Sequence, residues 1–358
     1  MLARRRRSTV GRVSLRNLLG IPHPIVLGPF GGLSSTELVA AVSDVGGLGS
    51  YGLYGYGPDR IRDTITAIRA ATDRPFAVNL WLPTGDEVAP ADVDLTAARA
   101  AAAPFFDELG MPVPPVPERF LPDIDAQLQA VLDAAPAVLS VVYGVPSAGL
   151  IAAARDRGIR VIGTATSVAE ARALDAAGVD AIVASGAEAA GHRVSFLAPP
   201  EESLVGTFAL VPQVVDAVSV PVIAAGGIAD RRGVAAAFAL GAAGVQVGTA
   251  FLRTRESAAT DAHRHAIATS SDTTTRLTRA MSGRLGRGIP NRAMRELEAA
   301  GDIAPFPAQN WLTGQFRAEA GRRGMGDLLS LWAGQAAGLA TRTDAADVFA
   351  ELRAGLPG

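Results

Sequence analysis

The most constraining feature of this chain is a series of short apolar runs, each bounded by Gly or Pro. A run that stays apolar, instead of alternating with polar residues, indicates a strand buried on both faces, as in a parallel sheet. Eight such runs are present, at residues 24–27, 47–50, 76–80, 138–142, 161–164, 181–184, 222–225 and 245–248. Stretches of helical character separate most of them, at residues 35–45, 58–71, 147–157, 167–177, 212–217 and 232–240. Eight strand–helix units in series predict an α/β fold, a closed (β/α)8 TIM barrel, rather than an open doubly wound sheet.

Two segments interrupt this alternation of strands and helices, and they predict how the chain is divided into domains. Residues 82–136 follow the third strand and are rich in proline, which predicts an insertion at the catalytic end of the barrel. Residues 254–343 follow the eighth strand and look mostly helical, which predicts a small substrate or lid domain. We therefore expect a flexible basic tail over 1–20, a barrel over 21–253, and a C-terminal helix within 344–358 that returns to the barrel.

The composition excludes several kinds of chemistry. The 358 residues include no cysteine and no lysine, which excludes disulfides, thiolate catalysis, iron–sulfur clusters, cysteine–zinc sites and Schiff bases. A net charge of −2 at pH 7 gives no indication of a nucleic-acid partner. No run approaches the about 20 apolar residues of a membrane span, and the basic start is not followed by the apolar segment of a secretory signal. We predict a cytoplasmic protein with no metal site and with neither nucleic acid nor membrane as a partner.

Glycines after the last two strands predict a phosphate site. The loops after the seventh and eighth strands of such a barrel commonly bind phosphate, because backbone amides and a helix N-terminus can approach the anion closely. Gly226 and Gly227 follow the seventh strand. The eighth strand runs into Gln246, Val247, Gly248 and Thr249. Together these loops predict that a phosphate-bearing ligand is bound at this end of the barrel.

Residues after three other strands can accommodate a flat ring. The first strand leads into Gly28, Pro29 and Phe30, where the backbone can press against a planar group. Asn79, at the end of the third strand, has an amide that can both donate and accept at the edge of a pyrimidine-like ring. Small residues after the sixth strand leave further room: Ser185, Gly186, Ala190 and Gly191.

His192 ends this small-residue loop and is the predicted catalytic residue. Histidine can accept a proton near neutral pH, and can stabilise an anion when it is charged. The chain has only four histidines: His23 precedes the first strand at the opposite end of the barrel, and His263 and His265 lie two apart on a predicted helix and so face different directions. Glu188, in the same loop as His192, is predicted either to act in the site or to brace the loop by accepting backbone hydrogen bonds.

Several stretches of the chain resemble the nitronate monooxygenase family, once called 2-nitropropane dioxygenases. They are residues 186–193, 225–228, 246–249, 282–284 and 331–335. The resemblance runs over nearly the whole chain, from about residue 21 to about residue 352. It implies a non-covalently bound FMN, contacted by Asn79, the loop after the sixth strand, Gly227 and residues 246–249. It also implies that His192 is the active-site histidine.

The chain departs from the family pattern around the same site. Ser185 stands where the family usually has Gln, and Ala190 where it usually has Gly. Val194 replaces the Gly that usually follows the His-Arg pair, and Val142 stands where a histidine commonly follows the fourth strand. These changes make the pocket smaller and drier. FMN is still expected as the cofactor. The substrate is left open, so a specialised biosynthetic flavin oxidoreductase is one alternative.

The resemblance implies oxidation of a small nitronate or nitroalkane by O2, through FMN, to a carbonyl compound and nitrite, in a monomer or homodimer. His192 would hold the anionic nitro group or take the α-proton of the neutral nitroalkane. An NAD(P)H-dependent FMN reductase of enoyl thioesters or quinones is an alternative on the same scaffold. A flavin-free barrel that binds a phosphate ligand is a further alternative. Four arginines could bind a substrate carboxylate, or form surface and interdomain ion pairs: Arg193, Arg253, Arg284 and Arg287.

Overall fold

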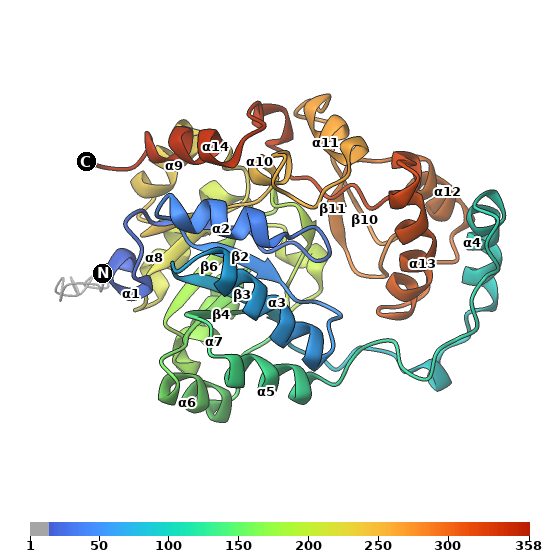
Figure 1. Cartoon of the computed structure of the whole chain (residues 1–358), viewed down its shortest axis with the longest axis horizontal. Helices are drawn as coiled ribbons and strands as arrows, with labels where there is room; N and C mark the ends of the chain where they lie inside the picture. Colours follow the sequence, from blue (N-terminus) through green and yellow to red (C-terminus); the bar gives the residue numbers. More distant parts are fainter. Residues whose placement is uncertain (1–13) are drawn as a thin grey trace, which may run out of the picture.

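The computed structural model describes residues 14–358 and shows a barrel of eight parallel strands surrounded by helices (Figure 1). Neighbouring strands follow the order β1-β9-β8-β6-β5-β4-β3-β2. A parallel bridge between Val26 and Leu48 joins β1 to the segment that leads into β2, and so closes the sheet on itself. The predicted TIM barrel is confirmed. Its strands are β1 (Ile25–Leu27), β2 (Gly49–Gly52), β3 (Phe76–Trp81), β4 (Val138–Val142), β5 (Arg160–Ala165), β6 (Ala181–Ser185), β8 (Val222–Ala225) and β9 (Gly244–Val247).

The strands lie where the uninterrupted apolar runs predicted them, and burial gives the reason. Every residue of β1, β4 and β8 is buried. One face of each strand meets the barrel interior, while the other meets the surrounding helices. Val26, Ile162 and Ile223 belong to one cluster that fills the interior. The residues just past the carboxyl ends of the strands are where the site is built.

The prediction of a flexible tail over residues 1–20 is wrong for its last part. Residues 1–13 lie outside the described residues. Helix α1 (Leu15–Leu19) buries Leu15 and Leu19 in the interior cluster of the barrel. Leu15 approaches so closely that a Cβ atom on Gly244 would lie 2.5 Å from its Cδ2 atom. This helix covers the amino-terminal end of the barrel, opposite the strand ends that carry the predicted site.

Helices form the outer layer of the barrel. Helix α8 begins at Thr207, earlier than the predicted start at Pro212, because this proline lies inside the helix and not in its first turn. Helix α14 packs against α2 and α9 of the barrel wall. Within residues 14–358, no helix is both long and apolar enough to cross a membrane. The outer helices are α2 (Thr36–Asp44), α3 (Pro58–Ala71), α5 (Ile124–Ala134), α6 (Ala148–Asp156), α7 (Val168–Ala177), α8 (Thr207–Ala217), α9 (Arg231–Ala239) and α14 (Ala345–Arg353).

A second unit, with a hydrophobic cluster of its own, stands beside the barrel (Figure 1). It contains α4 (Thr96–Glu108), α12 (Arg292–Ala300) and α13 (Ala308–Arg322). The rings of Phe105 and Phe106 on α4 lie 5.1 and 5.7 Å from the ring of Phe316 on α13. The segment 82–136 is thus divided between the two parts of the molecule: α4 joins the second unit, whereas α5 packs against α3 in the barrel wall.

A small antiparallel sheet ties the second unit to the barrel. It contains β10 (Arg276–Thr278), β11 (Gly286–Gly288) and β7 (Gly191–His192), in the order β10-β11-β7. The pairing sets Gly286 opposite His192. Residues 254–343 are therefore not only helical, and their hairpin fixes the loop that carries the predicted catalytic residue. The remaining elements are α10 (Thr249–Leu252), α11 (Asp261–Ala268) and the 3-10 helices η1 (Pro90–Asp92), η2 (Pro200–Ser203), η3 (Gly326–Leu328) and η4 (Ala337–Leu339).

Candidate active site

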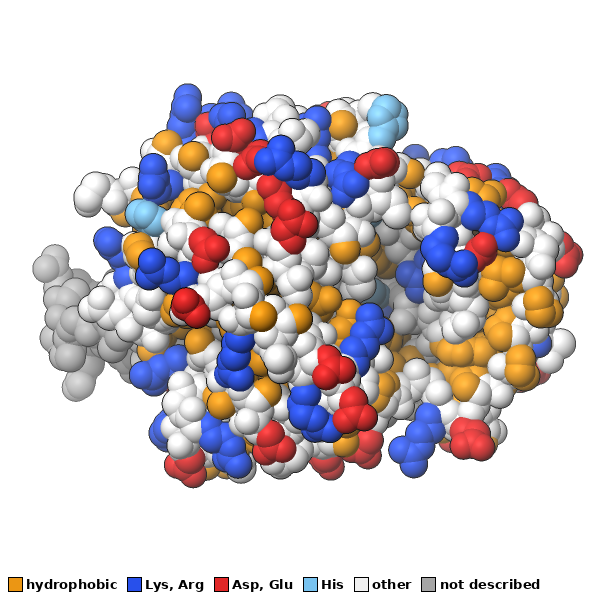
Figure 2. All heavy atoms as spheres, viewed as in Figure 1, with side chains coloured by type: hydrophobic (Ala, Val, Ile, Leu, Met, Phe, Trp, Pro, Cys, Tyr) orange, Lys and Arg blue, Asp and Glu red, His pale blue; other side chains and the backbone are white. Residues whose placement is uncertain are grey.

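A cavity of about 610 Å³ lies at the carboxyl ends of the barrel strands, where the second unit faces the barrel. Figure 2 shows the surface hollowed between these two parts. The volume falls in the range of about 300–1,000 Å³ that is typical of small-molecule sites. The cavity brings together every predicted site residue except Gly186 and Val247. These are Gly28, Pro29, Phe30, Asn79, Ser185, Ala190, Gly191, His192, Gly226, Gly227, Gln246, Gly248 and Thr249.

Gly186 and Val247 lie outside the cavity lining. Val247 is 1% exposed and packs in the layer between strands and helices. Gly186 lies behind the loop, where an added Cβ would be 1.9 Å from Thr207 Oγ1 and 2.4 Å from Glu188 Oε2. Glu188 accepts hydrogen bonds from the Thr207 amide, at 2.9 Å to each carboxylate oxygen, and from the Thr207 hydroxyl at 2.8 Å. Of the two roles predicted for Glu188, this geometry matches the loop brace.

The glycine turns after β8 and β9 can hold an anion through their backbone. Gly226 and Gly227 have φ angles of 101° and 73°, which favour glycine, and lie beside Gly248 because their strands are neighbours. No hydrogen bond between described residues uses the backbone amide of Gly227 or Gly248. The N-terminus of α9 does not contribute as predicted, because Asp230 accepts from its first amides at 2.9 and 3.3 Å. The unpaired turn amides are therefore the groups that fit a phosphate here.

Asn79 and the first loop fit the edge and the face of a flat ring. Asn79 is 3% exposed, and its Nδ2 donates to the backbone oxygen and the hydroxyl of Ser140 at 3.2 and 3.0 Å. These bonds orient the amide and leave its Oδ1, within residues 14–358, free to accept from a ring N–H. Gly28 lies so near the last loop that a Cβ would be 3.1 Å from Gly248 Cα. The backbone here can thus approach a planar group closely.

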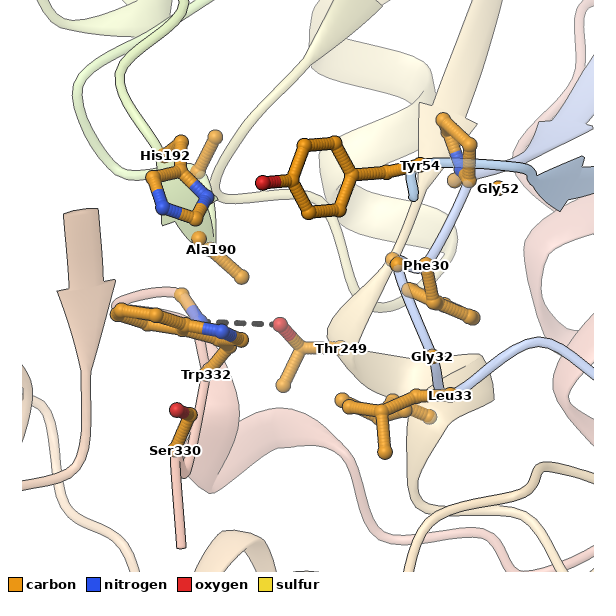
Figure 3. Close-up of a pocket in the computed structure, with 18 of the residues that line it drawn as sticks. Phe30, Gly32, Leu33, Gly52, Tyr54, Ala190, His192, Thr249, Ser330 and Trp332 are labelled. Atoms are coloured by element: carbon orange, nitrogen blue, oxygen red, sulfur yellow. Dashed lines mark hydrogen bonds between the residues drawn. The ribbon is translucent and has the colours of Figure 1, made fainter. Parts of the chain in front are cut away.

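His192 lies between two tryptophans in the wall of the cavity. Its ring is 4.9 Å from that of Trp81, edge to face, and 5.2 Å from that of Trp332. Figure 3 shows the imidazole above the Trp332 indole, with the hydroxyl of Tyr54 directed toward it. The pairing of β7 with β11 holds the backbone at this point. The imidazole therefore has a fixed position at the face of the cavity.

Ser282 determines which ring nitrogen of His192 is basic. The Ser282 hydroxyl lies 2.7 Å from His192 Nε2 and donates to the Arg284 carbonyl oxygen at 3.1 Å. Because a hydroxyl has one hydrogen, Nε2 is then the donor toward Ser282. This arrangement leaves Nδ1 with its lone pair. Ser282 belongs to the stretch 282–284, which the sequence singled out without assigning it a role.

Burial, together with the charges of Arg284 and Arg317, lowers the pKa of His192 to about 3. A charged imidazole loses its hydration in this apolar surrounding and is repelled by the two guanidinium groups. His192 is therefore neutral in the free protein at neutral pH. It can accept a proton, but it presents no positive charge before a ligand binds.

The four arginines proposed for a substrate carboxylate are used inside the protein. Arg193 donates to the carbonyl oxygens of Thr166, Ser185 and Ser203. Arg284 pairs with Asp86 and Glu87 at 2.6 and 2.7 Å, and lies over the rings of Tyr143 and Phe306. Arg253 donates to the Ala340 carbonyl and Arg287 to the Ala187 carbonyl. None of the four lines the cavity, so the carboxylate-binding alternative is wrong, whereas the ion pairs of Arg284 match the other alternative.

The structure adds cavity residues that the sequence did not reveal. Tyr54 and Trp81 follow β2 and end β3, with ring centroids 4.2 Å apart. Their positions at strand ends were a usable signal. Asn310 and Arg317 come from α13 and Trp332 from the segment after it. Nothing in the local sequence indicated that α13 faces the barrel.

Acidification is expected to destabilise the protein through His263. Burial lowers the pKa of His263 to about 4, although its Nε2 donates to the Trp332 carbonyl oxygen at 3.0 Å. An unfolded histidine has a pKa of about 6.5, so the unfolded chain binds more protons between these values. The contribution of His263 to the free energy of unfolding therefore falls as the pH falls through this window, by about 2 kcal/mol between pH 7 and pH 5.

Denaturant unfolding at pH 7 and pH 5 measures this effect. His263→Gln should lose about 2 kcal/mol of the difference between the two pH values. The same change at the exposed His265, two residues away on α11, should leave the wild-type difference in place. A His263→Gln variant with an undiminished pH dependence would show that another group is responsible.

The chain is similar to known proteins over nearly all of its length. It matches the family model described as nitronate monooxygenase over residues 12–354. A probable nitronate monooxygenase of Staphylococcus aureus (strain Newman) is 39% identical over 340 residues, which is 94% of this chain and 95% of that protein. The structure of nitroalkane oxidase from Streptomyces ansochromogenes is similar with a TM-score of 0.83 and 34% identity, over 95% of this chain and 96% of that one. FabK from Thermotoga maritima is similar with a TM-score of 0.74 and 30% identity, over 96% and 95%.

Proposed function

Because the chain belongs to the nitronate monooxygenase family, we propose that it is an FMN-dependent oxidoreductase that oxidises alkyl nitronates with O2 to a carbonyl compound and nitrite. One observation carries the proposal. The cavity holds both a neutral, oriented imidazole, that of His192, and turns whose backbone amides are unpaired. A substrate lying against a phosphate-bearing cofactor would therefore be in reach of His192.

The residues present fit FMN. The amides of Gly227 and Gly248 would hold its phosphate, since they have no acceptor among the described residues. The free Oδ1 of Asn79 would accept from the N–H at the pyrimidine edge of the ring. The backbone of Gly28 and Phe30 would lie against the ring system. When bound, FMN supplies the redox chemistry, taking an electron from the nitronate and passing it to O2.

His192 would handle the proton and the negative charge of the substrate. With Nε2 donating to Ser282, Nδ1 can take the α-proton of a neutral nitroalkane. The proton then stays on Nδ1, and the imidazolium donates a charge-assisted hydrogen bond to the nitronate. Burial lowers the pKa of His192 in the free protein. The negative charge of the bound nitronate would raise this pKa again and so offset the effect of burial. Trp81 and Trp332 exclude water from this contact and so strengthen it.

Turnover of two substrates by the purified yellow protein tests the proposal. We expect O2 uptake and stoichiometric nitrite with propionate 3-nitronate and, more slowly, with nitroethane, because the neutral compound must first lose a proton. Boiled protein and protein stripped of flavin serve as controls. A flavin-loaded protein that gives neither O2 uptake nor nitrite with either compound contradicts the proposal.

The reductase alternative is separated by an anaerobic experiment. Under the proposed function, NADH and NADPH should leave the flavin absorbance near 450 nm unchanged over the time in which a nitronate bleaches it. Rapid bleaching by NADPH or NADH, with no response to the nitronate, would favour the reductase of enoyl thioesters or quinones. A colourless protein that binds a phosphorylated sugar would favour the flavin-free barrel.

A further inference from the structure

A smaller cavity, which we call the side cavity, lies beside the active-site cavity and has a volume of about 160 Å³. Its apolar lining residues include Leu80, Leu82, Leu121, Pro122, Ile124 and Phe306. Those from the end of β3 and the residue after it are buried, whereas those at the start of α5 and just before it are partly exposed. The side cavity therefore leads inward from the surface near the start of α5.

The polar side chains of the side cavity are largely engaged within the protein. Arg284 pairs with Glu87 at 2.7 Å, so these two charges compensate each other. Gln127 donates through its Nε2 to the Tyr56 carbonyl oxygen at 2.7 Å. A charged or strongly polar ligand would have to displace these contacts, or would lose its hydration without replacing it, which is costly in a buried site. The side cavity therefore suits a small apolar molecule.

The size of the side cavity favours the same kind of ligand. Its volume is below the lower end, about 300 Å³, of the range typical of sites for organic ligands. An apolar cavity of about 150 Å³ inside a protein stays free of water and binds small apolar species such as xenon. We therefore expect the side cavity to be accessible to dissolved apolar gases.

Tyr54 and Trp81 line both cavities and form the partition between them. Their ring centroids are 4.2 Å apart, so the two rings are in contact. On the side-cavity side, the ring of Phe306 lies 5.9 Å from that of Trp81. On the other side, the ring of His192 lies 4.9 Å from that of Trp81, and Asn79 precedes Trp81 by two residues on β3. A small molecule that passes the partition thus arrives beside His192 and beside the place proposed for the flavin ring.

We propose that the side cavity is the route by which O2 reaches the flavin, with the partition of Tyr54 and Trp81 at its inner end. The inference rests on the proposed function, in which O2 is the oxidant. O2 is small and apolar, and it enters apolar surroundings more readily than water. FMN and the substrate would occupy the active-site cavity when the flavin becomes reduced. A separate route lets O2 arrive before that cavity has emptied.

A variant that blocks the side cavity tests the route. Ile124→Trp places a larger side chain in the outer part of the side cavity, and Ile124 does not line the active-site cavity. The flavin is photoreduced without O2 and then mixed with O2, which takes two electrons and two protons and leaves as hydrogen peroxide. Recovery of the flavin absorbance gives the second-order rate constant. We expect Ile124→Trp to lower this constant by about tenfold and to change anaerobic bleaching by a nitronate by less than about twofold.

Gln129→Trp is the matched control on the same helix. Gln129 is exposed and lies outside the lining of the side cavity, so this variant should show wild-type rates in both half-reactions. Leu121→Trp, a second change in the outer part of the side cavity, should repeat the effect of Ile124→Trp. It takes the place of Ile124→Trp if that variant loses its flavin or melts early. Wild-type reoxidation in both blocking variants would overturn the route.

Xenon provides a measurement that does not depend on activity. Crystals of the flavin-loaded wild type under xenon pressure should show xenon in the side cavity, and crystals of Ile124→Trp should not. Absence of xenon from the side cavity of the wild type would overturn the assignment.

The same experiments separate this inference from the proposed function. If nitronates are not oxidised but the blocking variants slow reoxidation of the photoreduced flavin, the proposed function fails and the O2 route stands. If nitronates are oxidised but reoxidation is the same in the blocking variants as in the wild type, the O2 route fails alone. Slower bleaching by long-chain nitronates in the blocking variants, with normal reoxidation, would mean that the side cavity holds an alkyl chain and would overturn the choice of O2.

Discussion

His192→Asn is expected to lower kcat/KM for nitroethane by about 10²–10⁴-fold, the contribution of a positioned base. The loss should be smaller with the preformed ethyl nitronate, which needs no deprotonation. Asn offers an amide in place of the Nδ1 lone pair that Ser282 leaves free, so it can donate to a nitronate but cannot take its proton. Initial rates of nitrite formation with both forms of the substrate measure the two effects.

The pH dependence of kcat/KM is a second test of the role of His192. Because burial lowers the pKa of His192 to about 3, its imidazole is already neutral throughout the pH range of an ordinary assay. The kcat/KM profile of the free enzyme should therefore show no ionisation near pH 6.5 that disappears in His192→Asn. Such an ionisation would mean that His192 is solvated like a surface histidine. The inference that the site excludes water from His192 would then be wrong.

His23→Asn is the matched control for His192. His23 lies at the other end of the barrel, with its ring 5.8 Å from that of Phe349 on α14. The same substitution there should leave both nitrite assays unchanged. A His192→Asn enzyme with full activity on nitroethane and on its nitronate would remove His192 from the proposed mechanism.

Gly186→Ala is expected to destabilise the protein by about 3 kcal/mol or more and to release the flavin. The added Cβ would lie 1.9 Å from Thr207 Oγ1, 2.6 Å from Thr207 N and 2.4 Å from Glu188 Oε2. These are the atoms of the brace that joins the loop after β6 to the start of α8. Backbone is among them, so the clash cannot be relieved by a change of rotamer. Thermal melts and the flavin-to-protein ratio measure the outcome.

Gly149→Ala is the control for this substitution. Gly149 lies in α6, and the nearest atom to an added Cβ is Ser147 Oγ at 3.8 Å. Alanine should leave the melt unchanged or raise it slightly, because it favours helix. Glu188→Gln should be milder than Gly186→Ala, since it keeps the shape of the brace and removes its charge. Wild-type melting and flavin content in Gly186→Ala would show that Glu188 does not brace the loop.

Much of the barrel could be predicted because a parallel strand buried on both faces is a run of consecutive apolar residues. Runs such as 138–142 are apolar at every position, and the structure has a strand over Val138–Val142. Helix starts were less certain where a local signal was ambiguous: Pro212 is typical of a first turn, yet it lies inside α8. The start of α8 is set instead by Glu188, a residue of another segment.

The candidate site likewise has features that the sequence predicts and features that it does not. Glycine turns after successive strands necessarily meet at one end of a barrel, so Gly227, Gly248 and the loop of His192 could be placed together from their order alone. Their hydrogen-bond partners could not be predicted from that order. Ser282, which orients His192, lies 90 residues away in the sequence, and Asn310, which contacts Tyr54, lies 256 residues away.

The sequence by itself determined the barrel, the glycine turns that suit a phosphate, and the one histidine at the carboxyl end of a strand, because each depends on neighbours in the chain. Tertiary structure alone decided that α4 joins α13, that the arginines 193, 253, 284 and 287 are used internally, and that Tyr54 and Trp81 stand between two cavities. The physical reason is that the energy of a buried side chain depends on which groups surround it in space. Those groups come from segments whose approach is set by packing and not by local pattern.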